Sequence, residues 1–351
     1  MSNKEILDVL NKNNKYCFIN GDCLDTLKQI PDKSIDCIIT SPPYWQQREY
    51  DMPEDLDFIK IGLEDNYNDY VDNLRVVFDE AKRILKDSGS LWLNLGDKYV
   101  DKKLMGMPWR VAISLIDNGW ILRNDIIWDQ MKGTQSAKDR LRNIHEYIFH
   151  FVKSKKYYYN DEAIRIKPEK NAEEKDGKMV SATGVSGKKY FKQINESTVL
   201  TDEEKKNALD ALNETIEEMK KGEVVDFRMT IRGNQRTFHS NSTKISGRAK
   251  ELQNRGYYIL KMRAKGFLPS DIWRIVPEDK WRKDTHYAAF PEELLVIPIK
   301  ATCPENGVVL DMFSGTGSTV AAAVRFGNRG IGIDVSNNYN NLALKRMNIT
   351  E

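Results

Sequence analysis

Long apolar runs are missing from this 351-residue sequence. No stretch approaches the ~18 to 20 consecutive apolar residues that a membrane-spanning helix needs. The first fifteen residues, MSNKEILDVLNKNNK, also lack the apolar core of a secretory signal. We therefore expect a cytoplasmic protein with no membrane partner.

Cysteine is scarce as well. The four cysteines, Cys17, Cys23, Cys37 and Cys303, form no CxxC pair and have no zinc-ligand spacing with the four histidines. Redox-active cysteine pairs and structural zinc sites depend on such spacing. We predict buried, reduced thiols and no metal.

Net charge is small, because 54 Lys and Arg nearly balance 52 Asp and Glu. Its distribution is uneven, since residues 228–265 contain ten basic residues and one acid, Glu251. Asn, Gln, Ser, Phe and Tyr are interleaved with these charges, which offers phosphate neutralisation, base-edge hydrogen bonds and stacking surface together. This segment predicts a nucleic-acid partner, although a solvated charged surface is the simpler alternative.

Strands and helices alternate in the first part of the chain. Apolar, β-prone runs occupy residues 15–22, 35–41, 90–97, 121–128 and 146–154, and residues 66–86 and 107–118 have helical spacing. This alternation predicts a doubly wound α/β sheet.

The alternation stops between about residues 160 and 285. Thr201 and Glu204 have capping-box spacing at the start of a helix that ends at Gly222. Residues 173–189 are polar and glycine-containing, and we expect mobile loops there. The α/β pattern then returns, with strands at 307–312 and 330–335. One sheet split by an insertion is therefore expected, with boundaries at 1–159, 160–285 and 286–351.

The stretch DMFSGTGST, residues 311–319, runs from a strand through a glycine turn into a helix. Such a turn lets backbone N–H groups approach a ligand, and Asp334 ends the next strand where an acid can bind ribose hydroxyls. A plain tight turn is the alternative. Because the three-glycine dinucleotide fingerprint and the phosphate-loop GK[ST] are both lacking, a pyrophosphate ligand is disfavoured.

The stretch TSPPYW, residues 40–45, follows a predicted strand. Two prolines fix the backbone and lack N–H groups, so the carbonyls of Ser41 and Pro42 are presented rigidly. Rigid acceptors followed by the aromatic Tyr44 suit a planar substrate with an exocyclic amino group. A proline-stiffened loop with buried aromatic side chains is the alternative.

Together these stretches resemble the motifs of S-adenosylmethionine-dependent DNA amino-methyltransferases of the β group, over most of the chain. The resemblance implies a Rossmann-like, mostly parallel methyltransferase sheet in circularly permuted order, with an inserted DNA-recognition region. It implies that Asp22 contacts the cofactor adenine and that Phe290 and Pro291 lie on its methionine side. The remaining implied cofactor-binding residues are Asp311, Phe313, Gly315, Gly317 and Asp334.

TSPPYW is most similar to the motif of cytosine-N4 enzymes, so the resemblance implies transfer to cytosine N4 in double-stranded DNA. Adenine-N6 transfer is the nearest alternative, because both bases present an amino group beside a ring-nitrogen acceptor. A protein-glutamine methyltransferase and a catalytically silent DNA-binding module are more distant alternatives.

A target base inside a duplex must be flipped out, and we expect Tyr44 and Trp45 to replace its lost stacking. Ser41, Pro42, Pro43 and Tyr44 are the expected catalytic residues. The expected DNA contacts are Arg232, Asn234, Gln235, Arg236 and Arg248. A restriction endonuclease acting on the same site is a candidate partner, and the chain is expected to be a monomer or homodimer.

Overall fold

The computed structural model describes residues 2–47, 61–131, 138–234, 247–277 and 291–350. The chain forms two compact units. Unit 1 comprises residues 1–164 and 270–351, and unit 2 comprises residues 165–269. The unit boundaries lie at 164/165 and 269/270, whereas the expected domain boundaries were 159/160 and 285/286.

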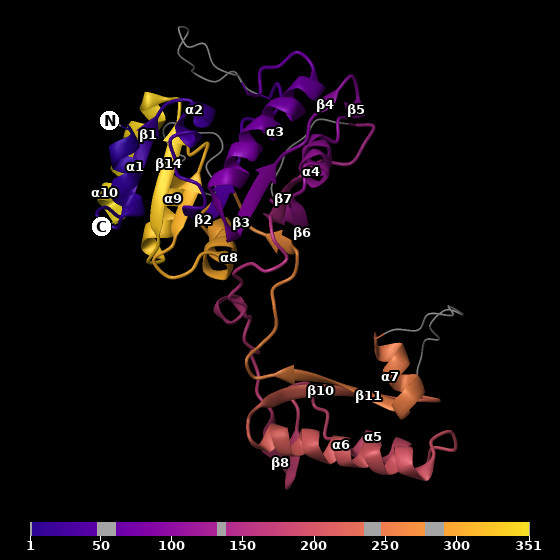
Figure 1. Ribbon diagram of the computed structural model, residues 1–351. Helices are drawn as coiled ribbons and strands as arrows, with labels where there is room; N and C mark the ends of the chain where they lie inside the picture. The colour runs from indigo at the N-terminus through magenta and orange to yellow at the C-terminus, as the bar shows by residue number, and fades with distance from the viewer. Residues whose placement is uncertain (1, 48–60, 132–137, 235–246, 278–290, 351) are drawn as a thin grey trace. The chain divides into compact units, whose positions relative to one another are not determined.

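Unit 1 is built on an eight-stranded sheet in the order β1-β14-β13-β2-β3-β7-β6-β12. Its strands are β1 (Tyr16–Asn20), β2 (Ile35–Thr40), β3 (Leu85–Leu95), β6 (Ile121–Asp129), β7 (His145–Val152), β12 (Ile272–Arg274), β13 (Val308–Asp311) and β14 (Arg329–Asp334). In Figure 1 the indigo amino-terminal and yellow carboxyl-terminal elements lie together, since β1 pairs with β14. Chain segments far apart in sequence therefore share one sheet, as predicted.

Most strand pairs of this sheet are parallel, and among its described strands only β7 runs antiparallel to its neighbours, β3 and β6. The carboxyl ends of β1, β14, β13 and β2 consequently meet at one edge of the sheet. Open α/β sheets bind ligands at this edge. The mostly parallel α/β fold predicted from the sequence is confirmed.

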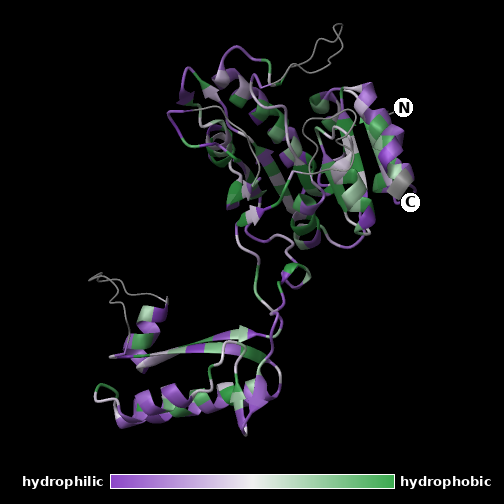
Figure 2. Ribbon diagram, turned by 180° about the vertical axis from the view of Figure 1, so that it is seen from behind, coloured by the Kyte–Doolittle hydropathy of each residue, from purple (hydrophilic) through white to green (hydrophobic). Residues whose placement is uncertain are grey.

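Helices cover both faces of the sheet. One face packs against α1 (Ser2–Leu10), α2 (Cys23–Leu27), α3 (Tyr67–Ile84) and α4 (Met107–Asp117), and the other against α8 (Glu293–Thr302) and α9 (Ser318–Arg325). Strand residues alternate between the two layers: Ile38 joins the first core, and Cys37 and Ile39 join the second. Figure 2 shows hydrophobic residues along these strands. The remaining helix of unit 1 is α10 (Asn337–Thr350), which packs against α9 and β1.

Two short elements complete unit 1. A hairpin of β4 (Tyr99–Val100) and β5 (Lys103–Leu104) precedes α4, and the single-turn 3-10 helix η1 (Glu162–Ile164) precedes the unit boundary. All four cysteines are buried free thiols, as predicted. Within the described residues, no helix has both the length and the apolar character that crossing a membrane requires.

Unit 2 packs α5 (Lys188–Asn195) and α6 (Asp202–Lys220) against an antiparallel hairpin of β10 (Val224–Ile231) and β11 (Tyr257–Arg263). The predicted capping box is present: Thr201 and Glu204 exchange side-chain and backbone hydrogen bonds at the start of α6. Helix α7 (Gly247–Arg255) leads into β11.

The expected loops at 173–189 are not all loops. Strands β8 (Glu173–Lys175) and β9 (Lys178–Val180) form a hairpin there, and α5 begins at Lys188. The two-residue turn is Asp176-Gly177, and both residues have positive φ, of 50° and 70°. Asp-Gly is a preferred sequence for such a turn, so the hairpin had a local signal that the polar composition obscured.

Candidate active site

The two sequence motifs meet at the carboxyl ends of neighbouring strands. Thr40, which ends β2, donates its hydroxyl to Asp311 Oδ1 on β13 at 2.8 Å. Asp311 also accepts from Thr319 Oγ1 at 2.7 Å and from the Phe313 N–H at 3.1 Å. Burial raises the pKa of Asp311 to about 6. The buried Asp311 therefore fastens the strand leading into Ser41 to the glycine turn.

The glycine turn between β13 and α9 has an open side and an unpaired hydroxyl. Gly315 has φ +50°, and a Cβ built on it would have no atom within 4 Å. Within the described residues, the buried Ser314 hydroxyl has no hydrogen-bond partner. A Cβ added at Gly317, in contrast, would collide with Phe18 and Ala343. The turn thus exposes backbone to a space in front of the sheet edge.

Asp334 closes this turn from the end of β14. Its two carboxylate oxygens each accept a backbone N–H at 2.8 Å, from Gly315 and from Ser336. Burial raises the pKa of Asp334, although these donors oppose the shift. Each oxygen has further lone pairs, so the carboxylate can still accept a ligand hydroxyl.

Of the other predicted cofactor residues, Asp22 lies at the same sheet edge. Asp22 follows β1 and caps α2 with one oxygen, accepting from the Asp25 N–H at 3.0 Å. Backbone pairing of Gly21 with Asp334 brings the end of β1 beside that of β14. Pro291 is buried in the turn before α8, and Phe290 lies outside the described residues.

Tyr44 belongs to a polar cluster that the sequence did not reveal. Ser41 Oγ donates to the Tyr44 hydroxyl at 3.2 Å, and that hydroxyl donates to Glu146 Oε2 at 2.7 Å. Asn94 Oδ1 lies 3.1 Å from the same hydroxyl, and Gln130 donates to Glu146 Oε1 at 2.8 Å. Burial and the Glu146 carboxylate raise the pKa of Tyr44 well above 10, so the phenol stays protonated.

The two prolines differ in their surroundings. The Pro43 carbonyl accepts from the Tyr70 hydroxyl at 3.0 Å. Among the described residues, no donor bonds the Pro42 carbonyl. Together with the lone pairs of the Ser41 hydroxyl, this carbonyl provides two acceptors at the end of β2.

Trp45 does not occupy the position expected of a stacking residue. Its side chain is only 6% exposed, belongs to the core beneath α3, and donates its indole N–H to the Glu64 carbonyl at 2.7 Å. A residue packed in this way stabilises the loop behind Tyr44. We therefore remove Trp45 from the predicted substrate contacts.

In unit 2 the predicted DNA contacts differ in environment. Arg232 is paired with Glu204 at 2.6 Å and also bonds the carbonyls of Gln253 and Val199. These partners make it a structural residue, which contradicts its expected role as a free DNA contact. Asn234 and Arg248 are exposed, whereas Gln235 and Arg236 lie outside the described residues.

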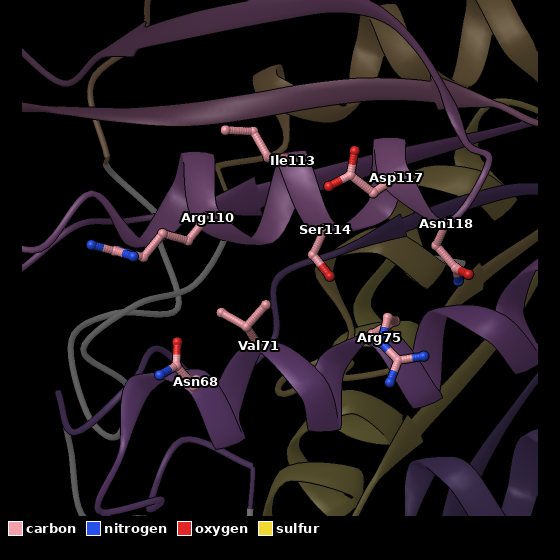
Figure 3. Close-up of a pocket in the computed structure, with 8 residues that line it drawn as sticks. All are labelled: Asn68, Val71, Arg75, Arg110, Ile113, Ser114, Asp117 and Asn118. Atoms are coloured by element: carbon pink, nitrogen blue, oxygen red, sulfur yellow. The ribbon is translucent and has the colours of Figure 1, made fainter.

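A separate hollow lies between α3 and α4. Figure 3 shows its lining, with Asn68, Val71 and Arg75 from α3 and the other five residues, Arg110, Ile113, Ser114, Asp117 and Asn118, from α4 and its end. None of the predicted site residues lines it. The chemistry of the two motifs therefore points to the sheet edge and not to this hollow.

Comparison with known proteins gives a consistent result. The sequence model of the DNA methylase family matches residues 35–207 and 181–345. The Type II methyltransferase M.SfiI of Streptomyces fimbriatus is 29% identical over 380 residues, covering 91% of this chain and 88% of its own. M.Cfr9I of Citrobacter freundii is 38% identical over 182 residues, covering 43% of this chain and 59% of its own.

Two solved structures share the fold. PvuII DNA methyltransferase (cytosine-N4-specific) superposes with a TM-score of 0.57 at 15% identity, covering 95% of this chain and 86% of that one. A putative DNA modification methylase from Thermus thermophilus, complexed with S-adenosyl-L-methionine, gives 0.51 at 19% identity, covering 95% and 94%. Since the family model matches most of the sequence, this chain belongs to the DNA methylase family.

Proposed function

We propose that the protein transfers a methyl group from S-adenosyl-L-methionine to the exocyclic N4 amino group of cytosine in double-stranded DNA. The observation that carries this proposal is the Thr40–Asp311 hydrogen bond of 2.8 Å. It fastens the acceptors of the TSPPYW stretch beside the glycine turn, so an amino group and a nucleoside-type cofactor would lie at the same sheet edge.

The residues at the turn fit this cofactor. Open space at Gly315, the unpaired Ser314 hydroxyl and the partly buried Asp334 carboxylate suit a ribose and its linkage. We propose that Asp334 and Asp22 hold the nucleoside and that Phe313 and Pro291 bound the pocket. Asp311 is enclosed by its three donors, so we assign it to positioning the turn and not to ligand contact.

S-adenosyl-L-methionine supplies an electrophilic methyl group on a sulfonium centre. The chain's part is to make the amino nitrogen a better nucleophile, because its lone pair is delocalised into the base. The Ser41 hydroxyl donates its hydrogen bond to Tyr44, so the Ser41 lone pairs remain free to accept from the amino group. With the Pro42 carbonyl as second acceptor, positioning and electrostatics supply the acceleration, without a covalent enzyme intermediate.

The cytosine assignment is supported by Ser41 and by the similarity of TSPPYW to cytosine-N4 motifs. PvuII DNA methyltransferase, a cytosine-N4-specific enzyme, shares the fold at 15% identity, which is too distant to assign the base. Adenine N6 offers the same donor and acceptor pair, so the base must be identified directly.

The first experiment is incubation of the purified protein with unmethylated genomic DNA and S-adenosyl-L-methionine, followed by digestion and mass spectrometry of the nucleosides. N4-methyldeoxycytidine is the expected product. Ser41→Ala should lower turnover by about a hundredfold or more, the scale for loss of one group that polarises the reacting centre. Sequencing the methylated DNA identifies the site.

Calorimetry of cofactor binding is the control, since Ser41→Ala should leave that affinity nearly unchanged. N6-methyldeoxyadenosine as product would overturn the base assignment and retain the methyl-transfer chemistry. Absence of any methylated base, with cofactor-bound wild-type protein, would reject DNA as the substrate.

A further inference from the structure

Leu141 is exposed to a degree that no other large apolar residue in the described chain matches. Its side chain is 91% accessible, whereas the next most exposed, Ile272, reaches 55%. Single exposed leucines are ordinary on protein surfaces. A leucine with almost no protein contact, held between two arginines, calls for an explanation.

The segment that presents Leu141 is connected to the catalytic stretch on both sides. Toward β7 it continues to Glu146, the residue that holds the Tyr44 hydroxyl. On the other side Arg140 lies over the Tyr99 ring, 3.7 Å from its centroid, and Asp139 pairs with Lys102 at 3.0 Å. Lys98, beside Tyr99, bonds the Gln46 carbonyl directly after the TSPPYW stretch.

Residues 98–104 and 138–143, which we call the Leu141 rim, are strongly basic. They contain six basic residues against two acids, Asp101 and Asp139. The basic residues are Lys98, Lys102, Lys103, Lys138, Arg140 and Arg142. This composition suits the phosphate backbone of a nucleic acid better than an apolar protein surface. The rim belongs to unit 1, whereas the basic segment 228–265 belongs to unit 2.

We propose that the Leu141 rim is a second DNA-contacting surface, and that Leu141 enters the base stack of the duplex where the target base is flipped out. Leucine is among the apolar side chains that proteins insert between base steps. The flanking Arg140 and Arg142 would contact phosphates and so hold the wedge against the duplex. This inference rests on the proposed function, because it assumes a flipped target base.

The test compares Leu141→Ala with wild type in single-turnover methylation. The substrates are a synthetic duplex carrying the mapped site and the same duplex with a mismatched target base. Leu141→Ala should be about ten- to a hundredfold slower on the matched duplex, because the wedge that offsets unstacking is lost. On the mismatched duplex, where the target is already unpaired, it should come within about threefold of wild type.

Leu344→Ala, which removes an exposed leucine on α10, is the matched control and should behave as wild type on both substrates. Equal rates for Leu141→Ala and wild type on the matched duplex would overturn the wedge. An equal slowing of Leu141→Ala on both duplexes would also overturn it. So would a change in oligomeric state, measured by sedimentation, with the methylation rate unaffected. If the wild-type protein did not methylate the matched duplex, the proposed function would fail, and this outcome is distinct from failure of the wedge.

Discussion

At the scale of single residues, the site depends on hydrogen bonds that fix donors and acceptors in one arrangement. The Ser41 hydroxyl donates to the Tyr44 hydroxyl, which donates to Glu146. Both hydroxyl hydrogens therefore point away from the proposed position of the substrate amino group. Such fixed polarity requires no reorganisation during the reaction. Asp311 has a comparable role beneath the glycine turn, and its titration makes that role measurable.

Asp311 should make the folded state less stable as pH rises. Its pKa is raised from 3.8 to about 6, so between these values the folded protein keeps a proton that the unfolded chain has released. The raised pKa therefore favours folding below pH 4, and this contribution is lost as pH rises through 6. A shift of this size corresponds to about 3 kcal/mol.

Asp311→Asn removes the titration while keeping the shape of the side chain. The difference in unfolding free energy between wild type and Asp311→Asn should therefore fall by about 2 kcal/mol from pH 4 to pH 7, because the unfolded Asp311 is already partly ionised at pH 4. Urea titrations followed by tryptophan fluorescence measure it, since all seven tryptophans are in unit 1. A difference independent of pH would show that Asp311 titrates normally.

At the scale of elements, the sequence predicted what local patterns control. The strands at 35–41 and 307–312, the helix at 66–86 and the capping box at Thr201 were all visible from periodicity and capping residues. The neighbours of Tyr44 were not. Asn94 reaches its hydroxyl from β3, which pairs parallel with β2, and Glu146 reaches it from β7, which pairs antiparallel with β3. Sequence spacing does not encode these pairings.

The two glycines of the turn between β13 and α9 should respond differently to alanine. At Gly315 the added methyl group meets open space and costs about 1 to 2 kcal/mol of left-handed strain. At Gly317 the Cβ would lie 2.7 Å from the Ala343 Cβ and 2.8 Å from Phe18 Cζ, so packing must also rearrange. Gly317→Ala should therefore destabilise unit 1 more than Gly315→Ala does.

Cofactor affinity should be lost for another reason in Gly315→Ala, because its methyl group enters the proposed ligand space. Calorimetry with S-adenosyl-L-methionine, beside urea unfolding, separates the two effects. Wild-type affinity in a folded Gly315→Ala protein would place the ligand elsewhere.

At the scale of the whole molecule, charge is divided between the units. Unit 2 contains 22 Lys and Arg against 15 Asp and Glu, a net charge of +7, whereas unit 1 contains 32 against 37. The basic excess at 228–265 is smaller than its sequence window indicated, because acids of α6 pair with it. Glu204 pairs with Arg232, and Glu218 pairs with Lys261 and Arg263. A linear window omits charges that folding brings alongside.

The described arginines of the basic segment therefore fall into two classes, those paired within unit 2 and those exposed without an ion pair. Arg228 on β10 and Arg248 on α7 are exposed, with no ion pair among the described residues. We expect these two exposed side chains to neutralise phosphates. The Arg232 guanidinium, in contrast, bonds Glu204 and two backbone carbonyls within unit 2.

Replacing both Arg228 and Arg248 by alanine should therefore weaken DNA binding and reduce the slope of log K against log salt by about 2, close to 0.9 for each lost phosphate contact. Arg232→Ala is the matched control: it should lower the thermal stability of unit 2 and leave the slope unchanged. Fluorescence anisotropy of a labelled duplex at several NaCl concentrations gives both slopes. A reduced slope for Arg232→Ala would mean that Arg232 leaves Glu204 to bind DNA. An unchanged slope for the double variant would place the phosphate-binding surface of unit 2 away from Arg228 and Arg248.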